Sequence, residues 1–186
     1  VVTDVTSRES VESMVEKAKE AFGKIDVLVN NAGILPKFKR FDRYSDEEIE
    51  RAININFYSC VYSVKTFLPM LLKSTDPGIV NIDSSAALMS LAGTSMYSAS
   101  KAALKGFTEA LREEFRGKCY VGLVCPGFTK TDIFRGQSNA GGKGEKVINM
   151  ISTDCDLMVK MIMFGMEHKQ ALQIHGVDAH AMSVFG

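Results

Sequence analysis

A tyrosine and a lysine, Tyr97 and Lys101, stand four positions apart in the stretch YSASKAALKGF. On a helix, residues four apart share a face, and most such pairs are simply solvated. A phenol has a pKa near 10 and is a poor base at neutral pH. An ammonium ~4 Å away, at an effective dielectric of about 20, favours the phenolate by roughly 4 kcal/mol, or about three pKa units. The pair is therefore a candidate for proton transfer, provided that other elements bring a substrate to it.

The elements that must position this pair follow from the spacing of apolar residues. Helical spacing predicts four helices, at about 6–23, 45–72, 95–115 and 154–167. Short apolar runs predict four buried strands, at 25–29, 79–82, 120–127 and 172–174. We expect the first of these strands to be buried on both faces. The alternation predicts one α/β domain over residues 1–186, with a parallel, doubly wound sheet.

Helix ends and loops carry their own signals. Thr6 with Glu9 predicts a capping box for the first helix, and Gly23 its end. Ser45 with Glu48 predicts a second capping box. The stretch 135–146 is rich in Gly, Lys and Ser and is expected to be a mobile loop.

Small or polar residues follow three of the expected strands. They are NNAG at 30–33, DSS at 83–85 and PGFTKTD at 126–132. The carboxyl ends of parallel strands meet at one edge of the sheet, and ligands bind beyond that edge. Three such endings together predict the floor of a binding crevice, beside which Tyr97 and Lys101 could act.

Composition excludes several other classes. Lys plus Arg equals Asp plus Glu, at 22 each, so nothing favours nucleic acid or an anionic membrane as partner. No apolar run is long enough to span a membrane, and no signal-peptide pattern opens the chain. The four cysteines lack a CxxC spacing and are interpreted as reduced thiols of a cytoplasmic protein, with disulfide pairing among the four as the alternative. The three histidines have no zinc-like spacing, and no metal is expected.

Taken together, the motifs resemble the short-chain dehydrogenase/reductase family. NNAG, a serine thirteen positions before YSASK, and PGFTKT at 126–131 match that family in order and spacing. The resemblance begins at TDV (3–5) and covers nearly the whole chain. It implies a Rossmann-like sheet with helices on both faces. It also implies an oxidoreductase that uses NAD or NADP to pass hydride between the nicotinamide and a carbonyl or secondary alcohol.

The resemblance assigns catalytic roles residue by residue. Tyr97 would be the general acid/base, and Lys101 would lower its pKa and hydrogen-bond the nicotinamide ribose. Ser84 would hydrogen-bond the substrate oxygen. It is preferred to Ser85 because the family's serine lies three positions after the strand asparagine, here Asn81.

Asn56 matches the helix asparagine that holds a water in the family's proton relay, with Asn54 the less favoured alternative. Besides Tyr97 and Lys101, the resemblance implies three groups of cofactor contacts. They are Asp4 and Val5 at the adenine, Asn30, Ala32 and Gly33 at the turn beside the adenosine ribose, and Pro126, Gly127, Thr129 and Thr131 at the nicotinamide carboxamide.

The family's glycine-rich pyrophosphate turn, G-x-x-x-G-x-G, is missing from these residues. A first βαβ unit of roughly 30 or more residues would supply it, together with the residue that separates NAD from NADP. We therefore expect an N-terminally truncated fragment that binds cofactor poorly as given. Two alternatives stay open: a non-catalytic dinucleotide-binding or scaffold protein, and a bare α/β domain of flavodoxin type.

The resemblance also implies a homodimer or homotetramer, paired through the helices at 45–72 and 95–115. Apolar residues on these helices could serve both core and interface: Phe57, Val61, Val64, Phe67, Leu68, Leu104, Phe107 and Leu111. The expected substrate is a small molecule. Apolar residues near the crevice indicate a lipid-like, steroid-like or fatty-acyl compound: Leu88, Met89, Leu91, Met96 and Phe134.

Overall fold

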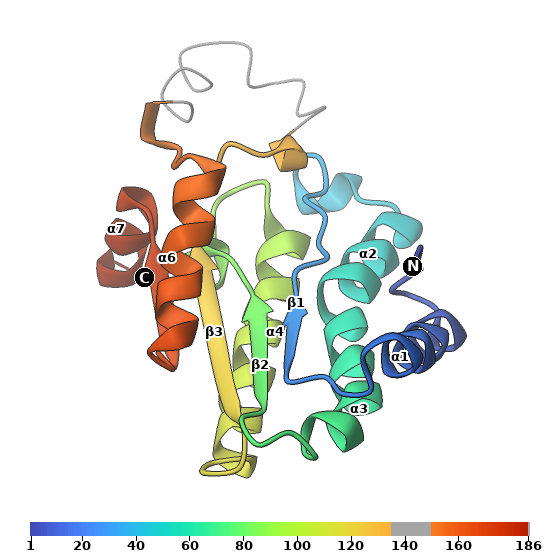
Figure 1. Cartoon of the computed structure of the whole chain (residues 1–186). Helices are drawn as coiled ribbons and strands as arrows, with labels where there is room; N and C mark the ends of the chain where they lie inside the picture. The colour runs from blue at the N-terminus through green and yellow to red at the C-terminus, as the bar shows by residue number, and fades with distance from the viewer. Residues whose placement is uncertain (135–149, 186) are drawn as a thin grey trace.

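A computed structural model describes residues 1–134 and 150–185 of the chain. Within them, four parallel strands form one sheet in the order β1 (Val27–Asn30), β2 (Gly78–Ile82), β3 (Tyr120–Pro126) and β4 (Leu172–His175). The carboxyl ends of the strands therefore lie at the same edge. The predicted parallel α/β sheet is confirmed, and Figure 1 shows helices on both of its faces.

The helices divide between the two faces of the sheet. One face carries α4 (Ser95–Glu114) and α3 (Ser59–Leu71), and α3 packs in turn against α1 (Arg8–Phe22). The other face is covered by α6 (Cys155–Glu167), which lies in front of β3 in Figure 1. A helix that the spacing did not predict, α7 (Val177–Phe185), follows β4 directly.

Two helix starts test the capping predictions. The Ser45 box is confirmed at the start of α2 (Asp46–Ile53): the Glu48 N–H donates to Ser45 Oγ, and the Glu48 carboxylate accepts from the Ser45 N–H. The first box is wrong, because Ser7 caps α1 by accepting from the Ser10 N–H. Thr6 instead donates its hydroxyl to Asp4. Gly23 ends α1 as predicted, with a positive φ of 71°.

The helix predicted over 45–72 is continuous but not uniform. Between α2 and α3 the chain forms a π-helical segment, η2 (Asn54–Tyr58). Such widened turns are rare and are often found at functional sites. Asn56, at the centre of η2, is fully buried, whereas Asn54 is exposed.

The main apolar core lies between the sheet and the helices α1, α3 and α4. Its buried members include Val11, Val64, Phe67, Leu71, Ile79, Leu111 and Val121. The prediction that the first strand is buried on both faces is wrong. Val27 and Val29 are 44% and 46% exposed, while Leu28 between them is buried. In the described structure β1 is an edge strand with helices against one face only.

Some expectations bear on the chain as a whole. All four cysteines are free thiols, and three of them are buried. Among the helices of the described residues, none combines the length and apolar character needed to cross a membrane. The loop expected at 135–146 lies outside the described residues.

Candidate active site

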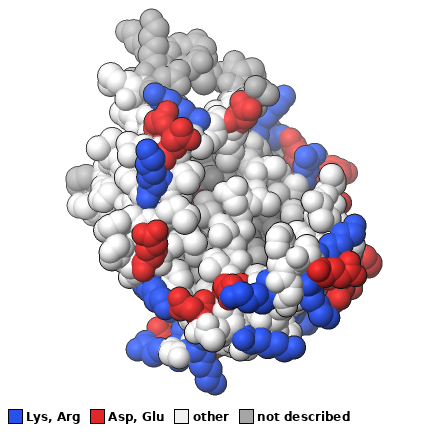
Figure 2. Space-filling view, in the orientation of Figure 1, with Lys and Arg blue, Asp and Glu red and all other residues white. Residues whose placement is uncertain are grey.

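A pocket of about 360 Å³ opens at the carboxyl edge of the sheet. Residues that follow β1, β2 and β3 line it, together with residues of α4, α6 and α7. On this face Lys, Arg, Asp and Glu lie mostly around the margin, and the hollowed centre is largely free of them (Figure 2). The predicted crevice at the strand ends is therefore present.

Tyr97 and Lys101 come from the first turns of α4 and both line the pocket. They are buried, at 9% and 4% exposure. Lys101 Nζ lies 5.9 Å from the centre of the Tyr97 ring and donates a hydrogen bond to the Ile82 carbonyl at 2.9 Å. The prediction that the pair shares a face and meets a crevice is confirmed by this geometry.

Lys101 was expected to lower the pKa of Tyr97, but in the chain by itself the pKa of Tyr97 is raised. Burial raises the pKa of the Tyr97 phenol, because a buried phenolate loses its hydration. Burial likewise lowers the pKa of Lys101. The ammonium is held at the Ile82 carbonyl, and besides burial the groups that act on the pKa of Tyr97 are Ser84, which lowers it, and Asp83, which raises it.

Of the two candidate serines, Ser84 is the one that interacts with Tyr97. A hydrogen bond between the Ser84 side chain and Tyr97 opposes the rise in the pKa of the phenol. Ser84 precedes the short helix η3 (Ser85–Ala87), and its Oγ accepts from the Ala86 N–H at 3.1 Å. Ser85 also lines the pocket but has no such contact with Tyr97 among the described interactions.

Asn56 lies behind the pocket and does not line it. Its Oδ1 accepts from the Ile34 N–H at 2.8 Å, and its Nδ2 donates to the Ile34 carbonyl and to Ser100 Oγ. A Cβ added at Gly33 would lie 3.5 Å from Asn56 Oδ1 and 3.8 Å from Lys101 Nζ. Asn56 therefore fixes the backbone that passes directly over Lys101.

The segment after β3 forms another wall of the pocket. The Gly127 N–H donates to the His175 carbonyl at 2.7 Å, and the Phe128 N–H donates to Asp178 Oδ2 at 2.8 Å. A Cβ at Gly127 would stand 2.1 Å from Asp178 Oδ1, so any larger residue there would displace the Asp178 carboxylate. Sequence reasoning missed Asp178, because α7 was not predicted.

Comparison with known proteins decides the family. A family model described as "short chain dehydrogenase" matches residues 1–142. The chain belongs to the short-chain dehydrogenase family. It is accordingly an oxidoreductase by family, and its parallel α/β sheet is the fold expected of that family.

Three relatives show how far the similarity extends. SadH of Mycobacterium tuberculosis is 34% identical over 190 residues, covering 97% of this chain and 68% of that protein. Retinol dehydrogenase 10-A of Danio rerio is 39% identical over 139 residues, covering 73% of this chain and 41% of that protein. A short chain dehydrogenase/reductase from Burkholderia phymatum, solved in complex with NAD, superposes with a TM-score of 0.84 at 25% identity, covering 92% of this chain and 68% of that one.

The predicted cofactor residues fall into two groups in this family member. Those predicted at the nicotinamide line the pocket with Tyr97 and Lys101: Pro126, Gly127, Thr129 and Thr131. Of those predicted at the adenosine, only Gly33 lines it, and Asp4, Val5, Asn30 and Ala32 do not. Asn30 instead donates its side chain to Asn81 Oδ1 at 2.8 Å and braces β1 against β2.

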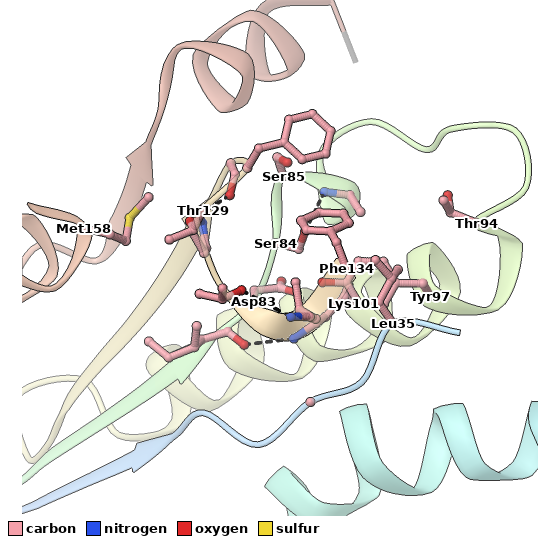
Figure 3. A pocket seen from close by; sticks show the side chains of 18 of the residues that line it. Leu35, Asp83, Ser84, Ser85, Thr94, Tyr97, Lys101, Thr129, Phe134 and Met158 are labelled. Carbon is pink, nitrogen blue, oxygen red and sulfur yellow. Dashed lines mark hydrogen bonds between the residues drawn. The ribbon is translucent and has the colours of Figure 1, made fainter. Parts of the chain in front are cut away.

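The pocket also holds an ionisable residue, Asp83, to which sequence reasoning assigned no role beyond the DSS stretch after the second strand. Asp83 lines the pocket between Ile82 and Ser84 and is 3% exposed. Burial raises the pKa of its carboxyl to about 8. The sequence signal that could have identified Asp83 is its position, since it is a charged residue directly after a buried strand. Figure 3 shows Asp83, Ser84, Tyr97 and Lys101 gathered together, with Met158 of α6 on the other side of the pocket.

Proposed function

We propose that the chain carries the catalytic site of an NAD- or NADP-dependent oxidoreductase that interconverts a carbonyl compound and a secondary alcohol. One observation carries this proposal. A single pocket brings together Ser84, Tyr97 and Lys101, and its opposite wall is the segment 126–131 that follows the neighbouring strand. A scaffold that only kept the fold would have no need to bury an ammonium beside a phenol.

The pocket fits the nicotinamide half of the cofactor. Gly33 carries no side chain, which leaves the backbone beside Lys101 open to a flat ligand, and Gly127 lines the same pocket. Lys101 would hold the ribose hydroxyls, and Thr129 and Thr131 would face the carboxamide. The relative from Burkholderia phymatum, solved with NAD, supports the same cofactor class. The adenosine contacts of Asp4, Val5, Asn30 and Ala32 stay predictions.

The proton chemistry follows from the state of Tyr97. The bound cofactor would supply or accept the hydride at the substrate carbon. In reduction, the buried phenol is a proton donor at neutral pH, and its proton passes to the substrate oxygen. Ser84 would hydrogen-bond that oxygen, and the charge of Lys101 would stabilise the phenolate left behind. Asn56 would position Ile34 and Gly33 over Lys101, and its predicted relay water stays a prediction.

The substrate class follows from the lining of the pocket. The rings of Phe128 and Phe134 lie 5.6 Å apart, and Met89, Leu91 and Met158 add further apolar surface. Of the five apolar residues named from the sequence, Leu88 and Met96 do not line the pocket. We therefore propose an apolar carbonyl or alcohol of lipid-like, steroid-like or fatty-acyl type. The relative named retinol dehydrogenase 10-A supports such a substrate by its name.

Tyr97→Phe in the full-length protein tests the assignment. Removing the phenol hydroxyl should lower kcat by about 10²–10⁴-fold on a panel of apolar ketones and alcohols with NADH and NADPH. Tyr120→Phe is the matched control, because Tyr120 donates its hydroxyl to the Gln170 carbonyl outside the pocket. Near wild-type rates in Tyr97→Phe would overturn the proposal.

Two other outcomes separate the alternatives. Cofactor binding without turnover across the panel would favour the non-catalytic protein, and no nucleotide binding at all would favour the flavodoxin-type domain. The homodimer or homotetramer and the cytoplasmic location stay predictions, and light scattering of the purified protein would measure the first.

A further inference from the structure

Asp83 is a buried carboxylate that the proposed reaction leaves unused. Among the described residues, neither of its oxygens accepts a well-formed hydrogen bond, and both are shielded from solvent. The Ser84 backbone N–H interacts with the carboxyl, but it lowers the pKa of Asp83 less than burial raises it. Its backbone N–H donates to the Val124 carbonyl at 2.7 Å, which continues the pairing of β2 with β3. The sheet therefore holds this side chain in place beneath the pocket. A buried polar group without a well-formed hydrogen bond costs stability, so its presence calls for an explanation.

Ionisable groups on three elements surround Asp83. They interact with its charge from α3, β3 and α4: Cys60, Cys125, Tyr97, Lys101, Lys105 and Glu109. Burial raises the pKa of the Cys60 thiol and raises that of Cys125 to about 12, so both thiols are neutral near pH 7. The charges of Lys105 and Glu109 offset each other in an ion pair of 2.9 Å.

Lys101 is therefore the cation of this surrounding group that is not already in an ion pair. Its ammonium binds the carbonyl of Ile82, the residue directly before Asp83. The two groups are held close in the chain without direct ion-pair contact. The charge of Asp83 acts on this buried ammonium, and the centre of the buried Tyr97 ring lies 5.9 Å from Lys101 Nζ.

We propose that Asp83 is a second ionisable group of this site, which competes with Tyr97 for the charge of Lys101 and sets the pH range of proton exchange. This inference rests on the proposed function. Asp83 is a positioning residue in this scheme: it acts on the reaction through Tyr97 and Lys101 and does not touch the substrate.

The direction of the effect follows from the charges. When Asp83 is ionised, its negative charge raises the pKa of Tyr97 and also that of Lys101. When Asp83 is neutral, this upward effect on the pKa of Tyr97 is absent. Groups that interact this strongly titrate as a set and not one by one. Alcohol oxidation needs the Tyr97 phenolate, so its rate rises with pH as Tyr97 loses its proton.

Two neutral variants test the proposal in the full-length protein, Asp83→Asn and Asp83→Ser. Removing the carboxylate should shift the acidic limb of kcat for alcohol oxidation to lower pH, by about one unit, the size at which two sites count as coupled. Both variants should shift alike, because only the charge matters. Asp26→Asn is the control for net charge, since Asp26 pairs with Lys24 away from the pocket. Unshifted profiles, or shifts that differ between Asn and Ser, would overturn the inference.

A measurement without turnover separates this inference from the proposed function. The ionisation of Tyr97 can be followed by NMR of ring-labelled tyrosine, with Tyr97→Phe to assign the signal. The titration of Tyr97 should move to lower pH in both Asp83 variants and stay in place in Asp26→Asn. If Tyr97 titrates in this way and no substrate turns over, the coupling of Asp83 to Tyr97 is real and the proposed function fails. If turnover occurs but Tyr97 titrates as in the wild type, the inference alone fails.

Discussion

The side chain of Lys101 shows how strongly a single residue is constrained in this pocket. An ammonium that is 4% exposed has lost its hydration, and one hydrogen bond to the Ile82 carbonyl replaces only part of it. Such a residue weakens the fold, and its presence is explained by the proposed chemistry. The same reasoning applies to Asp83, whose buried carboxyl interacts with the Ser84 backbone N–H but accepts no well-formed hydrogen bond.

Lys101→Met should separate stability from activity. A methionine of similar length removes the buried charge, so the free energy of unfolding should stay equal or rise. The rate of carbonyl reduction should fall about 10²-fold, because nothing then stabilises the Tyr97 phenolate. Urea unfolding and steady-state kinetics measure the two effects. Lys105→Met, which removes an ammonium paired with Glu109, is the control, and an equal loss of rate in both variants would contradict the prediction.

Asp83 should make the stability of the fold depend on pH. Its pKa is raised from 3.8 to about 8, so the folded state holds a proton that the unfolded state releases. This stabilisation is fully present below about pH 4 and is lost as pH rises through about 8. The stability of Asp83→Asn relative to wild type should therefore be greater at pH 9 than at pH 4, by up to about 6 kcal/mol. Melting temperatures at both pH values measure this, and a constant difference would contradict it.

At the scale of elements, the π-helical segment η2 connects a helix to the loop over the site. The widened turn places Asn56, and not Asn54, where its amide can bond both backbone groups of Ile34. In the same way, Asp178 at the start of α7 holds the Phe128 N–H and so the segment after β3. Both walls of the pocket are thus tied to elements behind them.

Asn56→Ala should show the cost of losing this connection. It leaves the Ile34 N–H and carbonyl without their partners, which should destabilise the fold by about 1–3 kcal/mol. The rate should fall as well, because the backbone over Lys101 is released. Asn54→Ala, at an exposed position, should change stability by less than about 0.5 kcal/mol. Chemical denaturation of both variants measures the difference, and equal costs would contradict the role given to Asn56.

At the scale of the whole molecule, the core is asymmetric around β1. Helices cover one face of this edge strand, so successive residues along β1 alternate between exposed and buried. The β2 and β3 strands lie inside the sheet, and their residues are buried almost throughout. The apolar core therefore lies mainly between the sheet, α1, α3 and α4.

Alanine substitutions at two adjacent positions of β1 should show this asymmetry. Leu28→Ala removes a core side chain and should cost about 2–5 kcal/mol of unfolding free energy. Val29→Ala removes a side chain that is 46% exposed and should cost less than about 1 kcal/mol. Urea denaturation measures both. A comparable loss in the two variants would mean that another surface covers Val29 in solution.

Local signals explain why much of the fold and site could be predicted. Apolar spacing located the four strands and four of the helices, since burial on one face leaves a period in the sequence. The Ser45 box and Gly23 end were readable because caps involve residues only a few positions apart. The four-residue spacing of Tyr97 and Lys101 was sufficient to predict a shared helix face. That Ser84 joins them was implied by the resemblance to the family.

What the sequence by itself determined is the alternation of strands and helices and the set of polar residues at the strand ends. Only the tertiary structure decided the electrostatics of the site, because burial depends on contacts between segments far apart in the chain. It showed that Tyr97 is held as a phenol, that Asn56 faces Ile34, and that Asp178 reaches the loop after β3. It also showed that the first residue of the DSS stretch, Asp83, is an ionisable group enclosed beside Lys101.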